Sequence, residues 1–107
     1  MIRFGPSGNS KIFYDEGNKA SIQAPAWLKS KGLSAYEYSF GRGYNMTKET
    51  AIKLGEEAKK NDITISAHAP FYINFANPSD EMAEKSCLYV LTALKVLDWF
   101  NGEHLVV

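Results

Sequence analysis

Alternating apolar and polar residues indicate where this chain is extended. Residues 63–67 alternate isoleucine or alanine with threonine or serine, a pattern typical of a buried β-strand. Residues 35–40 alternate aromatic side chains with glutamate and serine, which predicts a second strand. Short, mainly apolar runs at residues 2–4 and 104–107 predict the first strand of the chain and the start of the last one. The pattern therefore predicts about four strands.

Helical patterns lie between these strands. Residues 47–60 begin with a threonine N-cap and repeat apolar residues at helical spacing. A longer helix is predicted at residues 77–101, and residues 20–31 predict a shorter one interrupted near Pro25. Residues 11–14 are expected to be extended. The expected buried stripe of the longest helix consists of Ala83, Cys87, Val90, Leu94 and Leu97.

Strands that alternate with helices predict an α/β fold with a parallel sheet. The strands recur at intervals of about 30 residues, as in βαβ units, whose crossovers are right-handed. A closed barrel of eight such units needs roughly 200 residues or more, whereas this chain has 107. We therefore expect one domain over residues 1–107, with a parallel sheet of about four strands, βα crossovers and the architecture of a partial TIM barrel.

Composition narrows the class of partner. The chain has 12 basic residues (lysine and arginine) and 12 acidic residues (aspartate and glutamate), so its net charge is zero. A neutral chain is not expected to bind nucleic acid through its overall charge, although a local basic patch is still compatible with this composition. The single cysteine, Cys87, excludes an internal disulfide and is expected to be packed. Neither a signal peptide nor a membrane-spanning run is apparent. We expect a cytoplasmic protein that does not contact a membrane.

The candidate functional residues lie in or directly after the predicted strands. His68 follows directly after the strand at 63–67, at the carboxyl end where α/β barrels carry their functional groups, yet a lone histidine is also common as a hydrogen-bonded structural residue. Glu37 is either an inward-facing carboxylate or the salt-bridge partner of a helix. The loop at 41–45, with Arg42 and Tyr44, is either a contact for phosphate and base or a plain turn.

The segments at residues 68–74, 77–81 and 84–86 resemble the endonuclease IV family, with support from 2–6 and 36–41. Members are metal-dependent apurinic/apyrimidinic endonucleases of DNA base-excision repair, and their TIM-barrel fold is shared with xylose-isomerase-like sugar isomerases. The resemblance covers nearly the whole chain but only the N-terminal part of the family's barrel.

The resemblance implies roles for several residues. His68 matches the first zinc-ligating histidine of the family's trinuclear site. Phe71 and Tyr72 match loop residues that enter the DNA minor groove and help to flip out the abasic nucleotide, although packing in the core is their alternative role. Arg42 and Tyr44 lie in a segment that matches another DNA-facing loop.

The resemblance also sets limits on activity. His104 should not be a ligand, because the family's next ligand histidine follows the far end of that strand. The later ligands would all come after Val107, so we assign no catalytic residue, and we expect the 107-residue chain alone to be inactive and not to hold zinc stably. Two alternatives stay open, namely part of a sugar isomerase or epimerase barrel and a non-catalytic oligomeric half-barrel. In either case we expect a homo-oligomer, because sheet edges would be exposed.

Overall fold

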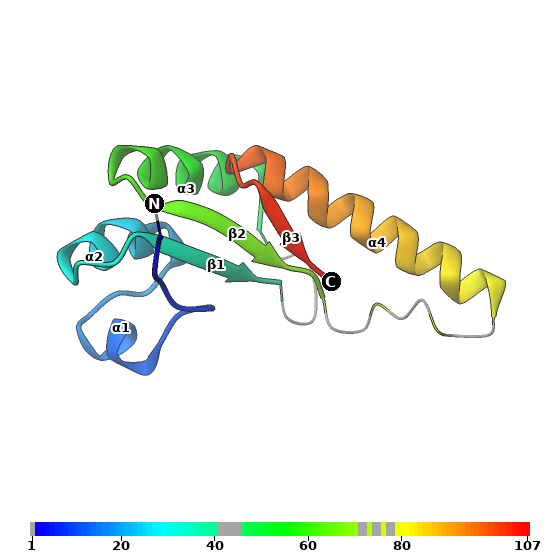
Figure 1. The fold of residues 1–107 in the computed structure, drawn as a ribbon, viewed down its shortest axis with the longest axis horizontal. Coiled ribbons are helices and arrows are strands. Elements are labelled where there is room, and N and C mark those ends of the chain that lie inside the picture. The colour runs from blue at the N-terminus through cyan, green and yellow to red at the C-terminus, as the bar shows by residue number, and fades with distance from the viewer. Residues whose placement is uncertain (1, 41–45, 71–72, 74–75, 77–78) are drawn as a thin grey trace.

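The computed structural model describes residues 2–40, 46–70, 73, 76 and 79–107. Its strands form one parallel sheet in the order β1-β2-β3, and helices cover one face (Figure 1). The elements in chain order are α1 (Lys11–Asp15), η1 (Ser21–Gln23), α2 (Ala24–Ser30), β1 (Ala35–Ser39), α3 (Lys48–Lys60), β2 (Thr64–His68), α4 (Asp80–Trp99) and β3 (His104–Val106). The expected α/β fold with a parallel sheet is confirmed.

The described sheet has three strands rather than about four, because residues 2–4 do not form one. The N-terminal segment, residues 2–8, nevertheless runs parallel to β1 and is bridged to it at Ser7 and Glu37. The Phe4 carbonyl also accepts hydrogen bonds from two backbone N–H groups at the start of β1. Pro6 has no N–H to donate, which breaks a regular ladder here. The segment therefore lies beside the sheet as a fourth, irregular parallel segment.

A hydroxyl side chain caps the start of both long helices, at the predicted residue in α3 but not in α4. The Thr47 side chain accepts a hydrogen bond from the Thr50 backbone N–H and starts α3 as expected. Ser79 caps α4 in the same way, later than the predicted start at residue 77, which lies outside the described residues. Residues 11–14, expected to be extended, belong instead to α1, because Ser10 caps a short helix there.

The core lies between the sheet and the helices on one of its faces. α3 and α4 pack against each other and against β2, while α2 contacts β1 (Figure 1). Strand residues at alternate positions supply one side of this core, as the period of two requires. The largest contributions come from Phe13, Leu28, Tyr36, Phe40, Leu54, Ile63, Ile65, Val96, Leu97 and Phe100.

The buried stripe of α4 differs from the predicted one. Cys87 and Leu94 are exposed, whereas Ser86, Ala93 and Val96 are buried. Both flanks of this helix carry apolar side chains, so periodicity alone did not determine which flank meets the sheet. As a result, α4 presents a second apolar flank to solvent.

Tyr36 gives the core a measurable signature at high pH. Its hydroxyl donates a 2.8 Å hydrogen bond to Oδ1 of Asn9, and burial raises the pKa of Tyr36 from an ordinary 10.0 to about 12. Since the folded state holds this proton more tightly, its contribution to stability is complete below pH 10 and is lost as pH rises to about 12. Burial also raises the pKa of Tyr38, so ultraviolet titration of phenolate should show more than one late-titrating tyrosine, and Tyr36→Phe should remove the one with a pKa of about 12. A titration unchanged by Tyr36→Phe would contradict this assignment.

Candidate functional site at the carboxyl ends of the strands

The face of the sheet opposite the helices carries polar side chains in two rows. Glu37, Ser66 and His104 are paired across the three strands and form one row. Ser39, His68 and Val106 form the next row toward the carboxyl ends. These positions alternate with the buried residues of the core, so they belong to the face that would be the inside of a barrel.

His68 is the last residue of β2 and is half-buried. Its Nδ1 lies 2.8 Å from the backbone carbonyl oxygen of Ala69, a distance at which Nδ1–H donates to that oxygen. This hydrogen bond selects the tautomer in which Nε2 carries the free lone pair. The ring is therefore orientated by the backbone and keeps one nitrogen available to a ligand, which is the usual arrangement of a metal-binding histidine.

Glu37 faces the same side of the sheet as His68, so it does not pair with a covering helix. Oε1 of Glu37 accepts a 2.8 Å hydrogen bond from Oγ of Ser7 in the N-terminal segment. A shallow hollow of about 190 Å³ opens here, lined in part by Arg3, Ser7, Glu37 and Ser66. Sequence reasoning missed the contribution of Ser7, since nothing in its Gly-Pro-Ser-Gly context distinguishes it from a turn residue.

The two candidate side chains lie in different rows of the sheet. Adjacent rows on one face are separated by two residues, or roughly 6.6 Å along a strand. Within residues 2–40, 46–70, 73, 76 and 79–107, no group of three or more His, Cys, Asp or Glu side chains could hold a metal ion. His68 fits the role of one zinc ligand, but the described part of the chain does not supply a complete ligand set.

The four proposed DNA-contacting residues, Arg42, Tyr44, Phe71 and Tyr72, all lie outside the described residues. The strand ends that precede them are neighbours. The N–H of Phe40 donates to the carbonyl of His68 over 3.1 Å, which extends the pairing of β1 with β2 by one residue. The two loops therefore leave the sheet from adjacent positions at its carboxyl edge.

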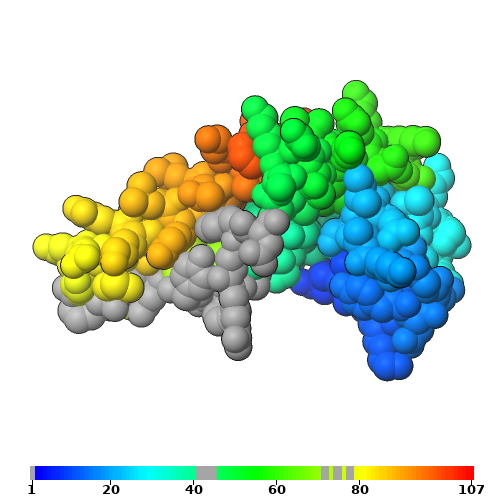
Figure 2. Space-filling model, turned by 180° about the vertical axis from the view of Figure 1, so that it is seen from behind, coloured from blue at the N-terminus to red at the C-terminus, as the bar shows by residue number. Residues whose placement is uncertain are grey.

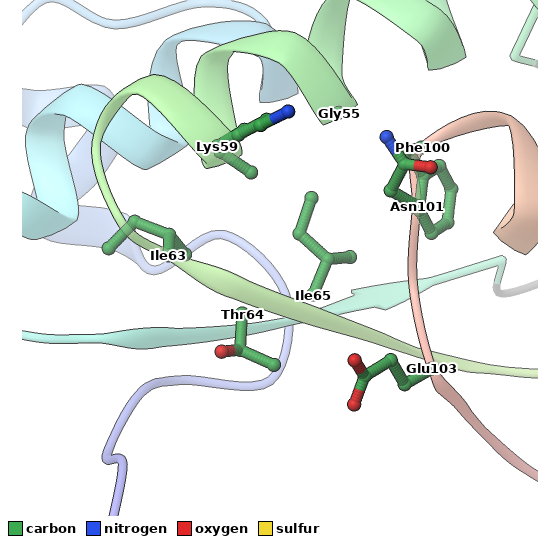
Figure 3. A pocket seen from close by; sticks show the side chains of 9 residues that line it. Gly55, Lys59, Ile63, Thr64, Ile65, Phe100, Asn101 and Glu103 are labelled. Carbon is green, nitrogen blue, oxygen red and sulfur yellow. The ribbon is translucent and has the colours of Figure 1, made fainter.

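A different hollow, of about 390 Å³, lies at the opposite end of β2. Figure 3 shows its apolar floor at Ile63 and Ile65, with Lys59 and Asn101 at the rim. The amino ends of barrel strands serve stability rather than chemistry. We therefore regard the carboxyl edge around His68 as the candidate functional site.

This chain has the architecture of a partial α/β barrel. Its strands are parallel, its helices lie on one face of the sheet, and a histidine stands at the carboxyl end of β2. A model of the xylose isomerase-like TIM barrel family matches residues 25–107. The chain belongs to that family. It is also 34% identical over 98 residues to an uncharacterized protein of Methanocaldococcus jannaschii, MJ0133. That alignment covers 92% of this chain and 33% of MJ0133, so the chain spans about a third of its relative's length.

No helix in the described part of the chain combines the length and the apolar character needed to cross a bilayer.

Proposed function

We propose that this chain is part of a metal-dependent abasic-site endonuclease of the endonuclease IV type, with His68 as a zinc ligand. The observation that carries the proposal is the geometry of His68. It stands at a carboxyl strand end, on the face away from the helices, and its Nδ1–H is hydrogen-bonded to the Ala69 carbonyl, so that Nε2 is the nitrogen that carries the lone pair. The residues that follow it, from Ala69 to Asn74, resemble that family's DNA-facing loop.

In such an enzyme the protein side of the site binds and orientates. The carbonyl of Ala69 fixes the imidazole of His68, so that Nε2 needs little reorganisation to reach a metal. Zinc, when bound, supplies a Lewis acid and a water of lowered pKa for phosphodiester hydrolysis. The chain's own contribution in this region is a fixed nitrogen ligand at the rim of a polar sheet face.

Binding of damaged DNA is assigned to the loops after β1 and β2. In this proposal Phe71 and Tyr72 enter the minor groove at the abasic site, where a missing base leaves little stacking to disrupt. Arg42 and Tyr44 contact the backbone and a neighbouring base or sugar. Support comes from the adjacency of the two strand ends, which gives both loops access to one duplex.

The metal role is tested by nuclear magnetic resonance of the two imidazole rings. Zinc titrated into the 107-residue chain should shift the ring signals of His68 with weak, millimolar-range affinity, since a single ligand is insufficient for tight binding. His68→Ala should abolish this response and His104→Ala should leave it intact. Zinc-induced shifts at His104 alone, or at neither ring, would rule out the assignment of His68.

The substrate class is tested by fluorescence anisotropy at low ionic strength. The chain should prefer a duplex with one abasic-site analogue over the matched intact duplex by several-fold, and Phe71→Ala with Tyr72→Ala should remove the preference. Incision of either duplex is not expected. Equal affinity for both duplexes, together with shifts of the Glu37 and His68 signals on adding an aldose, would instead support the sugar-isomerase alternative.

A further inference from the structure

A third hollow, of about 570 Å³, lies between the region of η1 and α2 and the helix α3. Both η1 and α2 contact α3, and Figure 2 shows this blue-to-cyan region directly beside the green α3. Consecutive helices are neighbours in the outer ring of an α/β barrel, so further helices of a barrel add beyond this pair rather than between its members. The volume lies within the range of small-molecule sites. The lining consists of Asn18, Ile22, Gln23, Ala26, Trp27 and Glu57.

Glu57 brings a carboxylate without a counter-ion into this hollow. It is half-buried on α3, and among the described residues that line the hollow it alone is charged. Within the described part of the chain its side chain forms no ion pair and no hydrogen bond. Lys53 lies one turn before it, which is the less favourable order for an i,i+4 ion pair. A cation from solution therefore finds an unpaired negative charge at a site where water screens it only in part.

The indole of Trp27 is held in one orientation at the edge of the same hollow. Its Nε1–H donates a 2.7 Å hydrogen bond to Oε2 of Glu16, and the ring of Phe13 packs against it edge-on at 5.3 Å between centroids. Nζ of Lys31 lies 5.6 Å from the indole centroid, but Lys31 does not line the hollow. The part of the indole that faces the hollow is therefore left to a ligand, and an indole both packs alkyl groups and attracts cations.

Two amide side chains in the lining have fixed orientations. Nδ2 of Asn18 donates a 3.0 Å hydrogen bond to the carbonyl of Phe13, so Oδ1 is the amide atom that remains to accept. Oε1 of Gln23 accepts from the backbone N–H groups of Lys19 and Ala20 over 2.7 and 3.0 Å. The polar lining thus offers two kinds of acceptor, a carboxylate and an amide oxygen, beside an apolar wall.

We propose that this hollow binds a small primary amine with an apolar chain, and that it is a second site, separate from the one at His68. The ammonium group pairs with the carboxylate of Glu57 and donates to Oδ1 of Asn18. The apolar chain packs against Trp27 and Ile22. A primary ammonium suits this lining better than a quaternary one, which has no N–H to donate and is typically enclosed by several aromatic rings.

Titration of the chain with hexylammonium, monitored by nuclear magnetic resonance of the indole N–H groups, tests the site. The Trp27 signal, assigned through Trp27→Phe, should shift with the millimolar-range affinity expected of so small a ligand. Trp99, at the end of α4, should not respond. Hexanol, a neutral analogue with the same chain, should bind at least about fivefold more weakly, because it cannot pair with a carboxylate. Equal binding of hexanol, or no shift at Trp27, would overturn the proposal.

A matched pair of charge variants locates the bound amine. Glu57→Gln should weaken binding of hexylammonium at least about fivefold, whereas Glu56→Gln removes the same charge from the exposed neighbouring residue outside the hollow and should have no effect. Equal losses in both would indicate general attraction to an acidic surface and overturn the proposal. Ala26→Phe fills the hollow from an exposed position on α2 without changing the charge, so it should also abolish the shift. Undiminished binding to this variant would likewise rule out the hollow as the site.

Discussion

Phe100→Ala should lower the free energy of unfolding by about 3–5 kcal/mol, the range for removing a buried phenylalanine from a core. Phe100 ends α4 and is 1% exposed. Its ring lies 5.9 Å from that of Tyr38 on β1, and its backbone packs against Gly55 of α3. Phe100 thus lies where the end of α4 meets α3 and β1, and removing its buried ring leaves a cavity in the core.

Urea denaturation monitored by circular dichroism measures this loss. The expected signature is a lower midpoint with an unchanged slope, because the surface exposed on unfolding stays nearly the same. Ile52→Ala is the matched control, since Ile52 is 39% exposed on α3 and its truncation should cost about 0.5 kcal/mol or less. A Phe100→Ala midpoint equal to that of the control would show that α4 does not end against the core as described.

Gly55→Val should destabilise the protein by a comparable amount, about 3 kcal/mol, at the upper end for overpacking. A Cβ at position 55 would lie 2.7–2.8 Å from backbone atoms of Phe100, closer than real contacts allow. Those atoms belong to the main chain and cannot rotate away, so α3 and the end of α4 would have to separate. Valine is only about 0.3 kcal/mol more favourable than glycine inside a helix, so the gain in helix stability is too small to offset the clash.

The same unfolding experiment, with Glu56→Val as control, tests the close approach. Glu56 is the next residue of α3 and is exposed, so the same side chain introduced there meets water rather than backbone. We expect the two valine variants to differ by more than about 2 kcal/mol. Equal midpoints would contradict the packing of α3 on Phe100.

The elements that sequence predicted best are those whose signals are local. α3 has its N-cap, its apolar spacing and its charged outer face within one continuous segment, and β2 has strict alternation. The rotation of α4 was predicted wrongly because it depends on which apolar flank meets β2 and β3, which is a tertiary matter. The short α1 was missed because a helix of 5 residues shows no period.

Within the candidate site, too, only the features with a local sequence signal could be predicted. His68 was predictable, because the end of an alternating run marks a carboxyl strand end without reference to the rest of the fold. Its row partners Ser39 and Val106, and the contact of Ser7 with Glu37, depend on strand register between distant segments. Register is determined by packing of the whole sheet and cannot be read from any one strand.

The order of the strands has a consequence for how the protein is made. Because β1, β2 and β3 are neighbours in the sheet in the order in which they occur along the chain, each new strand pairs with the one synthesised just before it. α3 packs on β2, and α4 packs on β2 and β3, so each helix also finds its partners nearby in sequence. Each strand pairing nevertheless spans a whole crossover, as Ala35 with Thr64 and Ser66 with His104 show, so its loop must close before the parallel pair forms, which makes pairing slower than helix formation. On the ribosome, each βα unit can dock as soon as it emerges, onto a surface that its predecessor has already formed.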